Sequence, residues 1–94
     1  MILTREAVIA KIEERLAGRL SDAQLAAWAF DQSYAYEVEE IDYEEGAEEL
    51  IDEVLDELMF ADDPAFQLDE EELRELQKLL RIPPSGSDGA REEA

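Results

Sequence analysis

The chain contains no cysteine and no histidine. It therefore cannot form a disulfide bond, a thiolate nucleophile or a zinc site built from those two residue types, and it lacks the commonest general base. Much enzyme chemistry is excluded in this way. We expect a protein that is not an enzyme and that needs no cofactor.

Basic residues are few and unevenly placed. The 94 residues include 27 Asp and Glu but only 8 Lys and Arg, which gives a formal net charge of -19. No Lys or Arg lies between Arg19 and Arg74. A field of this sign repels nucleic acid and anionic membrane surfaces and favours basic protein partners. We therefore expect no nucleic-acid ligand and no membrane ligand.

Long hydrophobic runs are also missing. No window reaches the roughly 20 apolar residues that span a bilayer, and the first ten residues have neither the apolar run nor the cleavage site of a signal peptide. We expect a soluble cytoplasmic protein. A hydrophobic fraction of 46% is ordinary for a globular chain of this length. The chain length and this fraction predict a single helical domain over residues 1–82. The polar composition of the C-terminal segment predicts a disordered tail over residues 83–94.

The segment 41–62 is the element around which we expect the chain to fold. Its apolar residues recur at steps of three and four, which places them on one stripe of a helix. Nearly every other position is a carboxylate. The pattern predicts a helix over about residues 43–60, with a box-like start at residues 42–45, one apolar side and one acidic side. The stripe consists of Ala47, Leu50, Ile51, Val54, Leu55, Leu58 and Met59.

Start and stop signals predict three further helices. Thr4 is a good N-cap for the first, and Gly18 supplies its end. Residues 21–24 and 69–72 have the form of capping boxes, each flanked by the two leucines of a hydrophobic staple. The second helix should end between residues 36 and 40, although the alternation over residues 34–43 also suits a short extended piece. Pro83 and Pro84 close the last helix.

The expected architecture is all-α, a small antiparallel four-helix bundle. In the first helix, apolar side chains including Ala17 should face inward, and Arg5 and the other basic residues should face water. In the last helix, the inner stripe should include Leu79. Phe66 should pack the preceding loop onto the core.

Metal binding and catalysis have little support. The loop at residues 62–63 lacks the alternating ligands and the glycine of an EF-hand, and the chain has no Glu-x-x-His motif of a di-iron bundle. A hydrolase with paired carboxylates needs a cleft for which a thin bundle leaves little room. We expect no metal site.

The aromatic residues admit two interpretations. Trp28, Phe30, Tyr34, Tyr36 and Tyr43 could all belong to the core and its edge, as a small bundle needs bulky side chains. Alternatively, Tyr34, Tyr36 or Tyr43 lies exposed among carboxylates, which is typical of an interface hot spot against a basic partner, and Tyr36 or Tyr43 would then be the anchor.

The order of motifs resembles that of small acidic helical bacterial proteins of unknown function. The matching pieces are LTRE at residues 3–6, G-x-LS at 18–21, LAxWA at 25–29, VLxxL at 54–58 and DDPAFxLxxEELxxL at 62–76. More distantly, the helical layout and acidity resemble the colicin D immunity proteins. That resemblance implies a four-helix bundle whose acidic residues block the active site of a tRNA-cleaving toxin.

We interpret the chain as an acidic binding protein, immunity-like, that docks on a basic partner such as a nuclease toxin. The alternative is a structural module that forms a homodimer, with an acidity that serves solubility or salt adaptation. The predicted partner-binding residues are Tyr36, Glu37, Glu39, Glu40, Asp42, Tyr43, Glu44, Glu45, Glu48, Glu49, Asp52, Glu53, Asp56 and Glu57.

Overall fold

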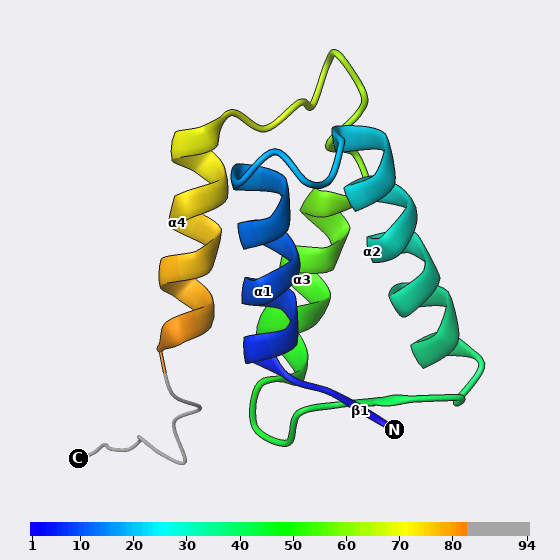
Figure 1. Ribbon diagram of the computed structural model, residues 1–94. Helices are drawn as coiled ribbons and strands as arrows, with labels where there is room; N and C mark the ends of the chain where they lie inside the picture. Colours follow the sequence, from blue (N-terminus) through cyan, green and yellow to red (C-terminus); the bar gives the residue numbers. More distant parts are fainter. Residues whose placement is uncertain (83–94) are drawn as a thin grey trace.

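The computed structural model describes residues 1–82, and this part of the chain is mostly helical (Figure 1). Its elements are β1 (Ile2–Leu3), α1 (Arg5–Leu16), α2 (Asp22–Glu37), β2 (Asp42–Tyr43), α3 (Glu48–Leu58) and α4 (Glu70–Arg81). The four predicted helices are confirmed. None of the helices in this described part is both long and apolar enough to cross a membrane. The predicted tail and the stop at Pro83 and Pro84 lie outside the described residues.

Three helices begin where the sequence predicts, each with a side-chain cap. The Thr4 hydroxyl accepts a hydrogen bond from the N–H three residues on, at 3.1 Å. Capping boxes join Ser21 to Gln24 at the start of α2 and Asp69 to Glu72 at the start of α4, with distances of 2.8 to 3.1 Å. These bonds satisfy N–H groups that a helix start leaves free. Local sequence therefore determines where α1, α2 and α4 begin.

Helices α1 and α2 both end in a Schellman motif. Its left-handed residue is Gly18 after α1, with φ 80°, and Glu39 after α2, with φ 64°. In each motif, the N–H groups of this residue and the next donate to carbonyls of the last helical turn at 2.8 to 3.1 Å. The predicted end of the second helix between residues 36 and 40 is confirmed.

The start of α3 differs from the prediction. Residues 42 and 43 form β2, which pairs in parallel with β1, and the N–H groups of Asp42 and Glu44 donate to the carbonyls of Met1 and Leu3 at 3.0 and 2.9 Å. Because these groups are engaged outside a helix, the box-like start at residues 42–45 is wrong. The helix runs from Glu48 to Leu58 and lacks a side-chain cap, so the prediction of a helix over 43–60 was too long at both ends.

Side chains from all four helices and both strands meet in one hydrophobic core. Helix α1 packs mainly on α4, and α2 packs mainly on α3. Figure 1 shows the four helices side by side, with the loops and strands at their ends. The fully buried large side chains are Leu3, Val8, Ile12, Leu25, Ile51, Val54, Leu55, Leu58, Leu73 and Leu80.

Several predictions of which side chains face the core and which face solvent were wrong. Ala17, Leu79 and Phe66 are exposed. In α4, Gln77 lies inward instead, where its Nε2 donates to the carbonyl of Ile9 at 3.2 Å. A buried amide is tolerated there because it finds an acceptor. The basic side chains of α1 are largely engaged with protein groups, so the prediction that they face water fails for Arg5 in particular.

Candidate protein-binding face

The outer side of α3 is a continuous row of carboxylates. The helix buries Ile51, Val54, Leu55 and Leu58 against the core, which leaves the positions between them in solvent. We call this row the α3 acidic face. Its members are Glu48, Glu49, Asp52, Glu53, Asp56 and Glu57, all of them exposed.

No carboxylate of the α3 acidic face forms an ion pair within the described residues. The ion pairs in this part of the chain all involve a basic residue of α1 or α4, which pairs within its own helix, with Asp22 of α2 or with Glu44. One of them joins Arg15 to Asp22 at 2.5 Å, and the pKa of Asp22 is lowered by that hydrogen bond and by a second one from Gln67. The negative charge of the α3 acidic face is therefore not compensated by the arginines of the first and last helices.

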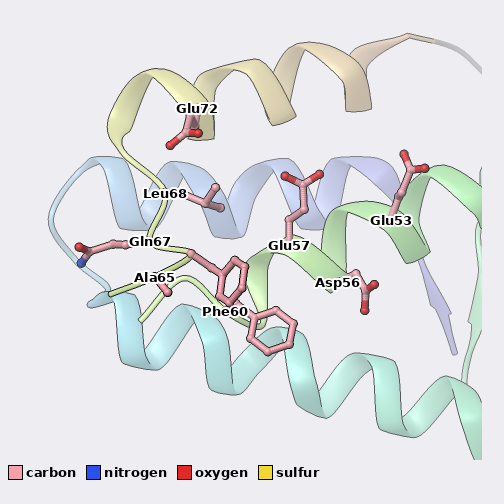
Figure 2. A pocket seen from close by; sticks show the side chains of 9 residues that line it. Glu53, Asp56, Glu57, Phe60, Ala65, Gln67, Leu68 and Glu72 are labelled. Carbon is pink, nitrogen blue, oxygen red and sulfur yellow. The ribbon is translucent and has the colours of Figure 1, made fainter. Parts of the chain in front are cut away.

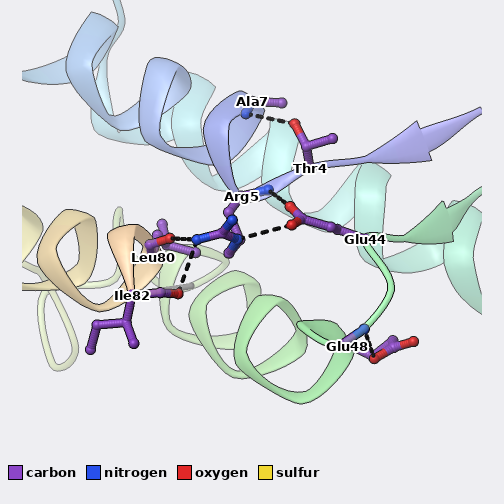
Figure 3. A network of polar contacts seen from close by, with 8 residues as sticks. Thr4, Arg5, Ala7, Glu44, Glu48, Leu80 and Ile82 are labelled. Atoms are coloured by element: carbon purple, nitrogen blue, oxygen red, sulfur yellow. Dashed lines mark hydrogen bonds and ion pairs between the residues drawn. The ribbon is translucent and has the colours of Figure 1, made fainter. Parts of the chain in front are cut away.

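Glu44 does not belong to this open surface, although the sequence predicted it there. Its carboxylate accepts a hydrogen bond from the backbone N–H of Arg5 at 2.9 Å and one from the Arg5 Nε at 3.1 Å (Figure 3). These bonds, led by the one from the backbone, lower the pKa of Glu44. The negative charge of Glu44 is therefore paired with Arg5 and is not part of the open acidic surface.

Tyr43 is part of the core, so the prediction that it could anchor a partner is wrong. Only 4% of its surface is exposed. Its ring stacks on that of Tyr36, with centroids 3.7 Å apart and an angle of 4° between the planes. Burial raises the pKa of Tyr43 to about 12, and the charge of Asp52 adds to this effect. Tyr36, the other tyrosine among the predicted partner-binding residues, is half-buried.

The remaining predicted residues lie at the end of α2 and on the connection from α2 to α3. Glu37 is the last residue of α2, and the connection carries Glu39, Glu40, Asp42 and Glu45. All five are exposed. A shallow hollow of about 370 Å³ brings Asp42, Glu45 and Glu48 together with the edges of both tyrosines. Asp42 and Glu45 therefore lie next to Glu48, at the start of the α3 acidic face.

Sequence reasoning missed a second hollow, at the other end of α3. This hollow, which we call the Phe60 groove, measures about 490 Å³. The signal was present in the sequence, because Phe60 follows Asp56 and Glu57 at steps of four and three, which places it on the acidic side of the helix predicted over residues 43–60. The groove is lined by Glu53, Asp56, Glu57, Phe60, Ala65, Phe66, Gln67, Leu68 and Glu72 (Figure 2).

The carboxylates do not converge. Within residues 1–82, no group of three or more acidic side chains is arranged so that it could hold a metal ion. They form an extended surface of like charge, which produces a negative electrostatic field around this side of the molecule.

Comparison of the chain with models of protein families, with curated proteins and with solved structures gives no match. The functional argument therefore depends on the geometry and charge of the chain's own residues.

Proposed function

We propose that this chain is a non-enzymatic acidic binding protein that docks the α3 acidic face on a basic, nucleic-acid-binding partner such as a nuclease. The observation that carries this proposal is the row of six exposed carboxylates without an ion-pair partner among the described residues. An antiparallel four-helix bundle is the arrangement we propose for the scaffold, since the successive helices are joined at their ends and pack on one another.

The like charges of the α3 acidic face repel one another and so destabilise the helix. Glu48 and Asp52, and likewise Asp52 and Asp56, are like-charged neighbours one turn apart on the helix. Each such pair is unfavourable by about 0.2 to 0.5 kcal/mol. Glu57 also places a negative charge in the last turn, where the helix dipole disfavours it. Solubility does not require that the charge be concentrated on one helix, and such a concentration suits recognition of a positive surface.

The charge pattern also favours a particular class of partner. A row of regularly spaced negative charges presents to a protein much the same field as a nucleic-acid backbone. A basic groove that binds phosphates would attract it from a distance. Such complementarity raises association rates from about 10⁵–10⁶ to as much as 10⁸–10⁹ M⁻¹s⁻¹ at low salt. Fast, salt-sensitive binding is the expected kinetic signature.

The test compares two variants with the same change in net charge. One neutralises the face with Glu48→Gln, Asp52→Asn and Asp56→Asn. The matched control neutralises Glu6, Asp31 and Glu71 in the same way, and these are exposed acids of α1, α2 and α4. Binding to a panel of basic ribonuclease domains is measured at low and high salt, together with protection of their RNA substrate.

We expect the face variant to lose binding at least tenfold more than the control, a difference of about 1.4 kcal/mol. Circular dichroism checks that both variants keep their helices. Equal losses in the two variants would show that only net charge matters. Absence of salt-sensitive binding to every domain would contradict the proposed partner class.

A second candidate function, self-association, is favoured by one observation on α2. Phe30 and Tyr34 are 59% and 57% exposed, and their rings stack with centroids 6.5 Å apart. An exposed aromatic pair can form the centre of a homodimer interface. Sedimentation equilibrium at moderate salt tests this role, because a stable dimer that Phe30→Ser and Tyr34→Ser dissociate would favour the oligomerising module.

A further inference from the structure

The Phe60 groove combines an apolar floor with an acidic rim. Phe60 and Phe66 remain 48% and 63% exposed although their rings contact each other, with centroids 5.7 Å apart and an angle of 53° between the planes. Leu68 closes the floor and is buried. Two large aromatic side chains exposed at one hollow are typical of a binding site. Their apolar surface is unfavourable in water, and a partner that covers it would remove this cost.

The rim carries negative charge from two different helices. Glu53, Asp56 and Glu57 project from the second half of α3, and Glu72 projects from the first turn of α4 (Figure 2). All four carboxylates are exposed. None of the four forms an ion pair within residues 1–82, although one oxygen of Glu72 accepts the N–H of Asp69 in the capping box of α4.

An arginine side chain fits both parts of this groove. Its guanidinium group is planar, weakly hydrated for a cation and able to stack on an aromatic face. The same group bonds a carboxylate through two parallel N–H donors. A lysine ammonium group is more strongly hydrated and lacks the planar fork, so it gains less from the two rings.

We propose that the Phe60 groove receives an arginine side chain of a basic protein partner, which stacks on Phe60 and Phe66 while its guanidinium pairs with carboxylates of the rim. This inference rests on the proposed function and adds to it the residue type that the partner presents. Charge complementarity argues against a second copy of this chain as the occupant, since each copy has a net charge of -19.

The test uses two short peptides of equal length and charge, one of alternating arginine and alanine and one with lysine in place of arginine. Affinities are measured by calorimetry for the wild-type chain and for the double variant Phe60→Ser, Phe66→Ser. The matched control is Phe30→Ser, Tyr34→Ser, which removes an equally exposed aromatic pair from α2. All four positions lie outside the buried core, so both variants should keep the fold.

We expect the wild-type chain to bind the arginine peptide about fivefold more tightly than the lysine peptide, the equivalent of a cation–π contact. The Phe60 and Phe66 variant should lose this preference but keep salt-sensitive binding to both peptides. The α2 control should retain the preference.

Three results would overturn the inference. Equal affinities of the wild-type chain for the two peptides would show that the groove does not select arginine. If the Phe60 and Phe66 variant still preferred the arginine peptide, the site that selects arginine would lie elsewhere on the protein. A dimer in sedimentation equilibrium that only this variant dissociates would show that a second copy occupies the groove. If the proposed function of the α3 acidic face were wrong, the result would differ from these three: the wild-type chain would show no salt-sensitive binding to either peptide.

Discussion

Arg5 and Glu44 form the contact that joins the two ends of the described chain to its middle. The Glu44 carboxylate accepts from the backbone N–H of Arg5 at 2.9 Å and from its Nε at 3.1 Å. From Nη1, the same guanidinium donates to the carbonyls of Leu80 at 3.0 Å and Ile82 at 2.9 Å (Figure 3). One side chain therefore holds the start of α1, the loop before α3 and the end of α4 together.

Replacing Arg5 should destabilise the protein. We expect Arg5→Ala to lower the free energy of unfolding by about 1 to 3 kcal/mol, the range for charge-assisted hydrogen bonds that are partly shielded from water. Arg5→Lys should recover only part of this loss, since an ammonium group cannot reach all three acceptors at once. The control is Arg74→Ala, which removes an exposed pair with Glu70 and should change stability by less than about 0.5 kcal/mol. Equal effects of Arg5→Ala and Arg74→Ala in urea unfolding would contradict the joining role.

The lowered pKa of Glu44 predicts a pH dependence. A carboxyl group with a lower pKa in the folded chain binds fewer protons there than in the unfolded chain. Its contribution to stability is therefore complete above its ordinary pKa of 4.5 and is lost as the pH falls through the lowered value. Glu44→Gln should be less stable than wild type at pH 7, and the difference between the two unfolding free energies should shrink as the pH falls toward 3. A difference that is constant across this range would show that the charge of Glu44 is not involved.

The parts of the fold that could be predicted are those fixed by neighbours in sequence. Ser21 with Gln24 and Asp69 with Glu72 form their capping boxes from residues three apart, so the sequence contains both halves of each device. The acidic side of α3 followed from its period of three and four in the same way.

The parts that could not be predicted depend on distant partners. Glu44 is held by Arg5, which lies 39 residues earlier, and β2 exists because β1 offers carbonyls to it. Tyr43 is buried for the same reason, since this pairing turns its ring against Tyr36 and the core. Phe66 has a large apolar side chain, as core residues do, but the loop leaves this side chain exposed at the surface. No local pattern distinguishes these outcomes.

The repulsion along α3 predicts that a single neutral substitution stabilises the fold. Glu53 has like-charged neighbours four residues away on both sides, at Glu49 and Glu57. Glu53→Gln should therefore raise the free energy of unfolding by about 0.4 to 1 kcal/mol at low salt. Salt screens these exposed charges, so the gain should largely disappear at about 1 M salt, where the Debye length is about 3 Å.

The matched control for this prediction is Glu49→Gln. Glu49 has one such neighbour within the helix and lies in the first turn, where the helix dipole favours a negative charge. Its neutralisation should change stability by nearly zero. Thermal unfolding of the two variants over a salt series provides the measurement, and a stabilisation by Glu49→Gln as large as that by Glu53→Gln would show that overall charge, and not position on the helix, sets the effect.

Glu39 and Gly18 occupy equivalent positions in two Schellman motifs, and they should respond to substitution in opposite directions. A side chain at positive φ is unfavourable by roughly 1 to 2 kcal/mol, whereas glycine adopts this region freely. Because glycine also loses more chain entropy on folding, Glu39→Gly should stabilise the protein by a net value of about 0.5 to 1 kcal/mol. Gly18→Ala should destabilise it by about 1 kcal/mol or more, and through the backbone alone, since a Cβ there would have no atom within 4 Å.

Glu40 supplies the control for this last comparison. It is the next residue after Glu39 and is equally acidic and exposed, but its φ is not positive. Glu40→Gly removes the same charge and should destabilise the fold, because it adds chain entropy to the unfolded state without relieving strain. If both glycine variants changed the unfolding free energy in the same direction, the effect would come from the lost charge. Opposite signs would locate it in the backbone of Glu39, where the acidic connection to α3 retains a strained residue in place of the glycine that ends α1.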